Sequence, residues 1–423
     1  MGQLAAFFHF DRWPPQPDLL FWFALTLLGG ALLGGAVSGR LGLPRIVGYS
    51  AAGMIVAALG RGLGDGRLLG TDRLIVDLAL ALLLFELGSR VSLRWLRVNP
   101  ALLVTSVLES LLSFWAIFAV LRWFELAPPL ALAGAALLGV SAAAVIGRVV
   151  TELRSAGQVS ERMIVLGALN TLYAVLLVKL VIGWLHLDRS GDWIQGLLQP
   201  VYTFGGSVLV AALLATAVGW VVRRFDLRDE NSVLLLLGLL LLALTAARLL
   251  ALSTLLVPLL AGVMLRNASE RPCIWPRHFG TAGGVLVLML FVIMGAAWSP
   301  ASLVAGFAVA ALVLIVRALT KVLVLAATAH FSGIAQRQSF ALAMGLTPIS
   351  VTSLVLLADL QLSHPAIAAE LVAPTLAANA LMALLGPVLV QGGLRLAREY
   401  HPAPAAGRRE ARSGPEAVGG ESV

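Results

Sequence analysis

The sequence predicts an all-α polytopic membrane protein with about 13 transmembrane helices. Three observations predict this class. Of the 423 residues, 59% are hydrophobic and only 12% are charged, whereas soluble globular chains average about 45–50% apolar and about 25% charged residues. The mean hydropathy is correspondingly high, at +0.93. The apolar residues also fall into separate runs, and most runs have roughly the 20 residues that a helix needs to cross a bilayer.

Short connections with glycine, proline or charged residues separate these runs. The runs begin near Leu19, Pro44, Leu74, Ala101, Pro129, Met163, Val201, Ser232, Ser253, Gly280, Ala301, Gln338 and Pro365. No connection is long enough to hold a second folded domain. We therefore expect a periplasmic N-terminal segment at 1–18, a transmembrane domain at 19–394, and a disordered cytoplasmic tail at 395–423, where the chain becomes polar.

Charge and composition predict the orientation in the membrane and exclude several kinds of functional site. Arginines are concentrated in alternate loops, which predicts an N-terminus outside and a C-terminus in the cytoplasm. Attraction of these loops to anionic lipid explains the net charge of +8, so we expect the lipid bilayer and no nucleic acid as a partner. One cysteine and six histidines exclude a disulfide framework and make a histidine metal centre improbable. No nucleotide-binding or catalytic motif occurs, so we expect no cofactor, no resident metal and no enzyme activity.

Two of the runs carry small and polar residues in mid-membrane. The fifth contains Ser141 within 139–142, and the twelfth contains Thr347, Pro348 and Ser350. Pro348 lacks an N–H and disrupts its helix, and the backbone groups so released need partners in protein or in a water-lined cavity. An odd number of spans suggests two inverted repeats of six helices with a linker helix, in which these two spans correspond. We therefore expect two broken, crossing helices that form a midplane site; a proline kink with small residues for helix packing is the alternative.

Several short motifs, taken in order, are similar to those of the monovalent cation:proton antiporter-2 family, the bacterial Na+/H+ and K+/H+ exchangers. These motifs are 41–49 with 52–53, 83–85 with Gly88, 257–262, 291–295, and Lys321, which precedes Gly333 by twelve residues. The resemblance implies a homodimer in the bacterial inner membrane. It implies a core of about 101–186 and 301–394 that moves against a scaffold. It also implies exchange of Na+ or K+ for H+ by alternating access.

The sequence departs from this family at the ion site. The family carries an Asp-Asp or Asn-Asp pair on the sixth helix, and the second aspartate binds the cation and the proton in alternation. Asn170 and Thr171 occupy this pair here. A threonine hydroxyl can offer an oxygen to a cation, but it cannot titrate. Exchange by this chain therefore needs another acid.

Charged residues inside the expected spans supply a candidate. A charge at mid-bilayer costs roughly 2.5–3.5 kcal/mol on the lenient insertion scale and requires a partner. Glu109 lies in the fourth span, and Arg317 and Lys321 lie one helical turn apart in the eleventh, which corresponds to the fourth in the expected repeat. We expect Glu109 and Lys321 to meet, with Glu109 as the titrating acid and Arg317 as a supporting charge. The alternative is a purely structural ion pair. Neutral oxygens would come from Ser141, Asn170, Thr171 and Thr347.

The sequence leaves three functions open. The first is exchange of a monovalent cation for protons at a non-standard ion site. The second is a protein that keeps the antiporter fold without transport, as a membrane scaffold, sensor or partner subunit, because the aspartate of the family is absent. The third is a transporter of another substrate, such as an organic anion held by Lys321 and Arg317.

Overall fold

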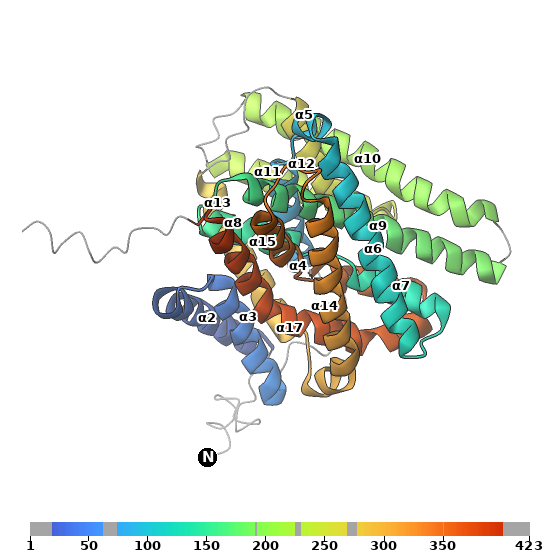
Figure 1. The fold of residues 1–423 in the computed structure, drawn as a ribbon. Helices are drawn as coiled ribbons and strands as arrows, with labels where there is room; N and C mark the ends of the chain where they lie inside the picture. The colour runs from blue at the N-terminus through green and yellow to red at the C-terminus, as the bar shows by residue number, and fades with distance from the viewer. Residues whose placement is uncertain are drawn as a thin grey trace, which may run out of the picture.

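The computed structural model describes residues 19–61, 74–190, 193–224, 230–268, 277–349 and 351–400. These residues form helices joined by short connections, and no β-strand occurs among them. The predicted all-α class is thus confirmed for the described part of the chain. Figure 1 shows α2 and α3 at one edge of the bundle, and α9 and α10 lie side by side at another.

The helices of the first half are α2 (Leu19–Ala36) with a π-helical turn η2 (Val37–Leu41), α3 (Arg45–Val56) with η3 (Ala57–Arg61), α4 (Leu74–Gly88), α5 (Leu93–Val98), α6 (Pro100–Trp123), α7 (Pro128–Leu138), α8 (Ala143–Glu152) and α9 (Gln158–Ser190). Those of the second half are α10 (Trp193–Arg224), α11 (Glu230–Leu249), α12 (Leu256–Ala268), α13 (Arg277–Ala296), α14 (Pro300–Thr328), α15 (Gln336–Leu346), α16 (Val351–Ser363) and α17 (Pro365–Ala397).

Six helices of the described residues are long and apolar enough to cross a membrane: Phe21–Leu41, Pro100–Trp123, Gln158–Trp184, Leu198–Arg224, Pro300–Thr328 and Pro365–Ala397. Shorter apolar helices are Arg45–Leu59, Pro128–Leu138, Leu234–Leu249, Leu256–Ala268, Gly284–Ala296 and Val351–Gln361. Every apolar run expected from the sequence coincides with one or two of the helices described above. The number of 13 crossing segments and their repeat stay predictions.

Proline sets the start of several of the long helices. Pro100, Pro128, Pro300 and Pro365 each occupy the first turn of a helix, where the missing N–H costs no hydrogen bond and the ring favours helical φ. At the start of α14, Ser299 also caps the helix in a reciprocal bond with the third helical residue. These local signals explain why sequence positions and helix starts agree closely here.

Two helices are interrupted within the bundle, and their interruptions touch. Residues 139–142 separate α7 from α8, and the break between α15 and α16 contains Pro348. Ser141 and Ile349 form an isolated antiparallel bridge. The N–H of Ala142 donates to the carbonyl of Pro348 at 2.9 Å. Backbone groups that leave the helical pattern at one break therefore find partners at the other, as an apolar interior requires.

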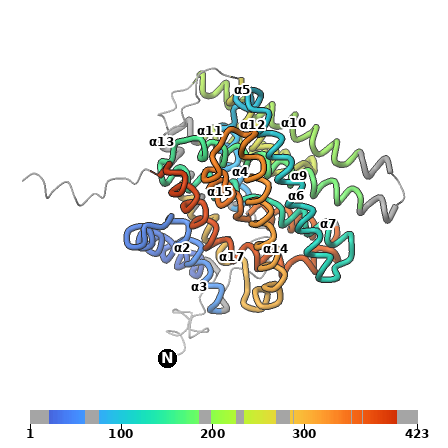
Figure 2. Tube along the Cα trace, in the orientation of Figure 1, coloured from blue at the N-terminus to red at the C-terminus, as the bar shows by residue number. Residues whose placement is uncertain are grey.

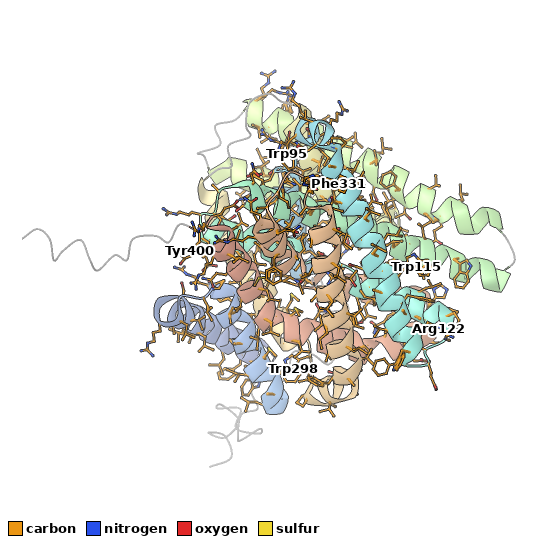
Figure 3. The ribbon with its side chains drawn as sticks, in the orientation of Figure 1. Trp95, Trp115, Arg122, Trp298, Phe331 and Tyr400 are labelled. Atoms are coloured by element: carbon orange, nitrogen blue, oxygen red, sulfur yellow. The ribbon has the colours of Figure 1, made fainter. Side chains whose placement is uncertain are left out.

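The buried apolar residues form two clusters. The larger one joins α3, α4, α6 to α9 and α12 to α17, and the smaller one joins α4, α10, α11 and α12. Figure 2 shows that α14 runs beside α6 although the two are far apart in sequence. In Figure 3, Trp95 and Trp298 lie toward opposite ends of the bundle, which suits aromatic residues at the two membrane interfaces.

Glycines allow α4 and α12 to pack with their backbones in contact. A Cβ added at Gly88 would lie 2.2 Å from the carbonyl oxygen of Leu259, and a Cβ added at Gly262 would lie 2.2 Å from that of Phe85. Such mutual approach needs small residues on both helices. Both glycines belong to the motifs that carry the family resemblance.

The folded domain extends beyond residue 394, where the sequence analysis began the tail. Helix α17 continues to Ala397, and Glu399 is only 8% exposed. Its carboxylate accepts bonds from the N–H of Val159 (2.8 Å) and from the N–H and hydroxyl of Ser160 (2.7 Å each). The first N–H groups of a helix have no acceptor within it, so Glu399 completes the start of α9. Residues 1–18, the expected N-terminal segment, and residues 401–423, the remainder of the expected tail, lie outside the described residues.

Candidate functional site

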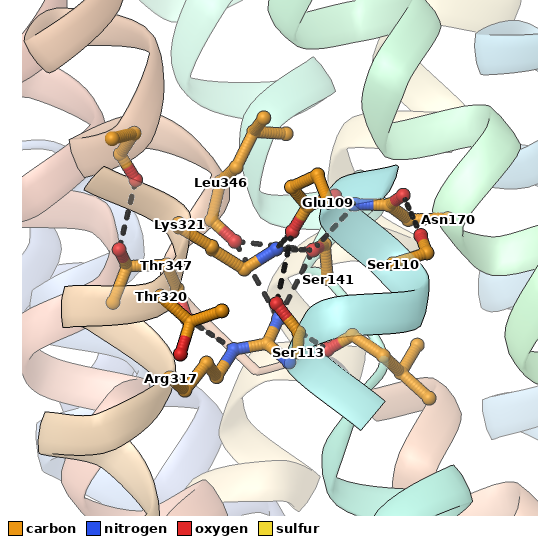
Figure 4. Close-up of polar contacts among 12 residues, drawn as sticks. Glu109, Ser110, Ser113, Ser141, Asn170, Arg317, Thr320, Lys321, Leu346 and Thr347 are labelled. Carbon is orange, nitrogen blue, oxygen red and sulfur yellow. Dashed lines mark hydrogen bonds and ion pairs between the residues drawn. The ribbon is translucent and has the colours of Figure 1, made fainter. Parts of the chain in front are cut away.

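A buried polar cluster lies where α6, α9 and α14 meet the two interrupted helices (Figure 4). Its side chains are Glu109 on α6, Ser141 between α7 and α8, Asn170 on α9, and Arg317 and Lys321 on α14. Asn170 is 3% exposed and the other four are 0% exposed. Charged groups so deep in an apolar bundle are costly, and they mark a functional site by default.

The carboxylate of Glu109 has a partner on each oxygen. The ammonium of Lys321 forms an ion pair with Oε1, and the amide Nδ2 of Asn170 donates to Oε2 at 2.9 Å. The expected correspondence between the fourth and the eleventh spans predicted that Glu109 and Lys321 would meet, and the structure brings these two side chains together. Their role in transport stays a prediction.

Two serines that were not predicted from the sequence also bind Glu109 and Asn170. Ser110 donates to Oδ1 of Asn170 at 2.6 Å, which directs the amide nitrogen toward Glu109. Ser113 donates to Oε1 of Glu109 at 3.4 Å. Ser113 follows Glu109 by one helical turn and therefore shares its face, a signal that could have identified it. Ser110 carries no comparable signal, because its partner belongs to another helix.

Arg317 binds backbone rather than a carboxylate. Its guanidinium donates to four carbonyl oxygens, those of Leu138 (2.9 Å), Val140 (3.1 Å), Thr347 (3.0 Å) and Leu346 (3.5 Å). These carbonyls end α7 and α15, where a helix leaves its last acceptors unpaired and carries partial negative charge. Arg317 thus neutralises two converging helix ends and holds both breaks in place.

The hydroxyl of Ser141 is shared by three donors. It accepts from Asn170 Nδ2 (3.0 Å), Arg317 Nη2 (3.0 Å) and Lys321 Nζ (3.1 Å), and it donates to the carbonyl of Leu346 (3.1 Å). A hydroxyl oxygen has two lone pairs, so three donors compete for two acceptor positions. One donor can therefore leave Ser141 without leaving the oxygen unsatisfied.

Other predicted site residues take different positions. The hydroxyl of Thr171 donates to the carbonyl of Gly167 in its own helix (2.9 Å), and that of Thr347 donates to the carbonyl of Ala343 (2.8 Å). Thr347 meets the cluster through its carbonyl oxygen, as described above. Pro348 likewise contributes a carbonyl to the contact between the breaks. Ser350 lies outside the described residues.

The cluster combines one titratable carboxylate with a competing ammonium and neutral oxygens. A hard monovalent cation prefers such oxygen ligands, and the carboxylate can hold either that cation, the ammonium or a proton. Among the described residues, no group of three or more His, Cys, Asp or Glu side chains could hold a resident metal. A carboxylate beside neutral hydroxyl and carbonyl oxygens has the groups that a small cation or a proton can bind.

Comparison with known proteins gives three findings. The family model "Sodium/hydrogen exchanger, transmembrane" matches residues 27–393. No curated protein sequence matches the chain. Two solved structures of the sodium proton antiporter from Methanocaldococcus jannaschii are similar. The first, at pH 8, has a TM-score of 0.63 with 17% identity and covers 89% of this chain and 95% of the antiporter. The second, an electron-microscopy structure, has a TM-score of 0.71 with 19% identity and covers 91% and 99%.

Proposed function

The chain belongs to the sodium/hydrogen exchanger family, and from this membership we propose that it exchanges Na+ or K+ for H+ with Glu109 as the ion carrier. Membership makes the protein a multi-pass membrane transporter for cation and proton exchange rather than an enzyme. The identity of the cation and the ion site are the proposal. The observation that carries it is the buried contact between the Glu109 carboxylate and the Lys321 ammonium beside the two helix breaks.

Competition for one carboxylate couples the two ions. When Glu109 is ionised, the Lys321 ammonium balances its charge, and an entering cation takes the place of that ammonium against the carboxylate and the Ser141 oxygen. When a proton binds Glu109, the carboxyl group becomes neutral and no longer holds the cation. Cation and proton therefore occupy the site at different times, which is the requirement for exchange.

The neutral ligands follow from the geometry of the cluster. Ser141 already faces the position of the ammonium, so a cation that takes the place of Lys321 competes with Asn170 and Arg317 for the same oxygen. The Oδ1 atom of Asn170 is held by Ser110, so Asn170 serves the site first by orienting Glu109. Thr171 and the Thr347 hydroxyl are weaker candidates, because each bonds within its own helix.

The transport cycle requires larger parts of the chain to move. We extend the proposal to a homodimer in a bacterial inner membrane, with the N-terminus outside and the C-terminus in the cytoplasm. Thirteen spans in two inverted repeats would place α6 to α9 and α14 to α17 in a moving core. The larger apolar cluster joins these two groups of helices to each other, which supports a single core formed by both, and it also extends to α3, α4, α12 and α13.

The other two functions remain as outcomes of the test. The hypothesis of an antiporter fold without transport rests on Asn170 and Thr171, because these residues occupy the positions of the aspartate pair of the family. An anion held by Arg317 has less support, because backbone carbonyls and Ser141 already occupy the nitrogens of its guanidinium.

The decisive experiment is proton exchange in proteoliposomes, measured with a pH-sensitive dye across pH for Na+, K+ and Li+. We expect exchange by the wild type and its loss in Glu109→Gln, because an amide cannot take up a proton. Glu86→Gln is the matched control, since Glu86 lies in a partly exposed pair with Arg90, and exchange should persist in it. Exchange retained by Glu109→Gln would refute the carrier assignment. Absence of exchange in folded wild-type protein would favour the function without transport.

A further inference from the structure

A second polar cluster lies in the other half of the bundle, on α16 and α17. Nδ2 of Asn379 donates to the hydroxyl of Ser353 (2.8 Å) and to the carbonyl of Thr375 (2.9 Å). Ser353 and Thr375 are 0% exposed, and Asn379 is 5% exposed. Both donor positions of the Asn379 amide are therefore in use.

Two oxygens in this cluster have no donor. Oδ1 of Asn379 and the hydroxyl oxygen of Thr375 are buried, and neither has a hydrogen-bond partner among the residues that the structure describes. Thr375 and Asn379 are one helical turn apart, so they share a face, with about 5–6 Å between their Cβ atoms. A buried polar atom without a partner costs about 1–3 kcal/mol, and one way in which a native protein removes this cost is to bind a water or an ion there.

The backbone next to these side chains offers a further oxygen. Pro374 lies inside α17 and has no N–H, so the carbonyl of Glu370 lacks its usual helical donor. Helix α14 packs closely against this turn, because a Cβ added at Gly306 would lie 2.2 Å from the carbonyl oxygen of Ala373. This turn of α17 thus packs against α14 and carries a backbone carbonyl without its helical donor.

The same asparagine–serine contact occurs in the first half, with one difference. Asn170 donates to Ser141 at 3.0 Å, as Asn379 donates to Ser353. In sequence, Asn170 follows Ser141 by 29 residues, and Asn379 follows Ser350 by 29 residues. The serine that Asn379 contacts is Ser353, which lies inside α16, whereas Ser141 lies in the break itself, so the two contacts match in residue type and not in register. Ser110 binds Oδ1 of Asn170, whereas Oδ1 of Asn379 is open.

We propose that Asn379 and Thr375 form a second binding site, for a dehydrated monovalent cation. Oδ1 of Asn379 can only accept, and both hydrogens of its amide nitrogen are already in use. The Thr375 hydroxyl has free lone pairs, so both side chains can offer an oxygen to a cation. Hard cations take oxygen ligands, and a cluster of neutral oxygens suits a single charge, since a divalent ion would be buried without a carboxylate. This site lies beyond the exchange proposed at Glu109 and does not depend on it.

The test measures thermal unfolding of the purified full-length chain in the Glu109→Gln background, which removes the charge of the first site. Na+, Li+ and K+ are titrated against choline at constant ionic strength. At least one of these cations should raise Tm in a saturable manner, because a ligand that binds only the folded state stabilises it. Adding Thr375→Val should raise the half-saturating concentration about tenfold, since tenfold corresponds to one lost ligand of roughly 1.4 kcal/mol.

Thr203→Val is the matched control, because Thr203 is a buried threonine on α10 (3% exposed), away from α16 and α17. Asn379→Asp is a second variant that adds a carboxylate, and it should lower the half-saturating concentration. A Tm that does not respond to these cations, or a response that neither Thr375→Val nor Asn379→Asp changes, would overturn the proposal and assign the cluster to water or packing. Failure of the carrier assignment would appear separately, as exchange retained by Glu109→Gln in proteoliposomes.

Discussion

Arg317 and Lys321 lie one helical turn apart on α14, yet the two cations have different partners. The planar guanidinium of Arg317 donates in several directions and binds four carbonyls at the helix breaks. The ammonium of Lys321 is a point charge, and it pairs with Glu109. Arginine suits fixed, multidentate contacts, whereas lysine suits a single exchangeable one. The residue types thus match a structural role for Arg317 and a competing role for Lys321.

This difference predicts the effect of Arg317→Lys. A lysine keeps the charge but cannot reach the ends of α7 and α15 together, so buried carbonyls lose their donors at about 1–3 kcal/mol. We expect a lower Tm for the purified protein by several degrees. Arg97→Lys, on the exposed side of α5, is the control and should leave Tm unchanged. An unchanged Tm in Arg317→Lys would show that the two helix interruptions are stable without the several N–H donors of a guanidinium.

At the scale of elements, the contact between α4 and α12 depends on the absence of side chains. Gly88 and Gly262 each approach the carbonyl oxygen of the opposite helix, as the added Cβ atoms at 2.2 Å show. Close backbone contact of this kind drives helix association in membranes, where burial of apolar surface gives no gain against lipid. The contact therefore sets how near α4 can lie to α12.

Gly262→Ala tests this contact. In an open helix, alanine stabilises relative to glycine by roughly 0.5–1 kcal/mol, but here the Cβ would overlap the Phe85 carbonyl. We expect a net loss of about 1–3 kcal/mol, the usual cost of overpacking, seen as a lower Tm. Gly238→Ala in α11 is the control, since a Cβ there has no atom within 4 Å, and its Tm should stay or rise. A Tm for Gly262→Ala that matches the control would contradict the close packing.

At the scale of the whole molecule, the end of the described chain is tied to the helix that carries Asn170. Glu399 follows α17 and accepts three hydrogen bonds from the start of α9. Gly157 makes room for it, because a Cβ at Gly157 would lie 2.2 Å from the Glu399 carboxyl carbon. A negative charge at a helix N-terminus is also favourable. The last turn of the domain thus stabilises the first turn of α9.

Glu399→Gln should loosen this link. The amide replaces one acceptor oxygen with a donor that faces an N–H group, which costs about 1–2 kcal/mol. We expect faster amide hydrogen exchange at Val159 and Ser160 and a small fall in Tm. Glu161→Gln is the control, because Glu161 lies in the same first turn of α9 but is exposed, and exchange at the helix start should not change. Equal protection in both variants would show that Glu399 is not needed at this end of α9.

By itself, the sequence determined the class of the protein, the positions of its apolar helices and the two interruptions at Ser141 and Pro348. Apolar run length and proline act locally, so they can be read without knowing what packs against them. The sequence also singled out Glu109 and Lys321, because charges are rare in apolar spans and each needs a partner.

Only the tertiary structure decided which partners these residues have. How the helices are rotated against one another decides which carbonyls Arg317 binds and how Ser110 orients Asn170. It also decides that the Thr171 hydroxyl bonds to a carbonyl of its own helix. Glu399 belongs to the domain for the same reason, since its acceptor role exists only where α17 meets α9. Contacts between segments far apart in the chain leave no local pattern, and side-chain rotamers follow the packing that those contacts create.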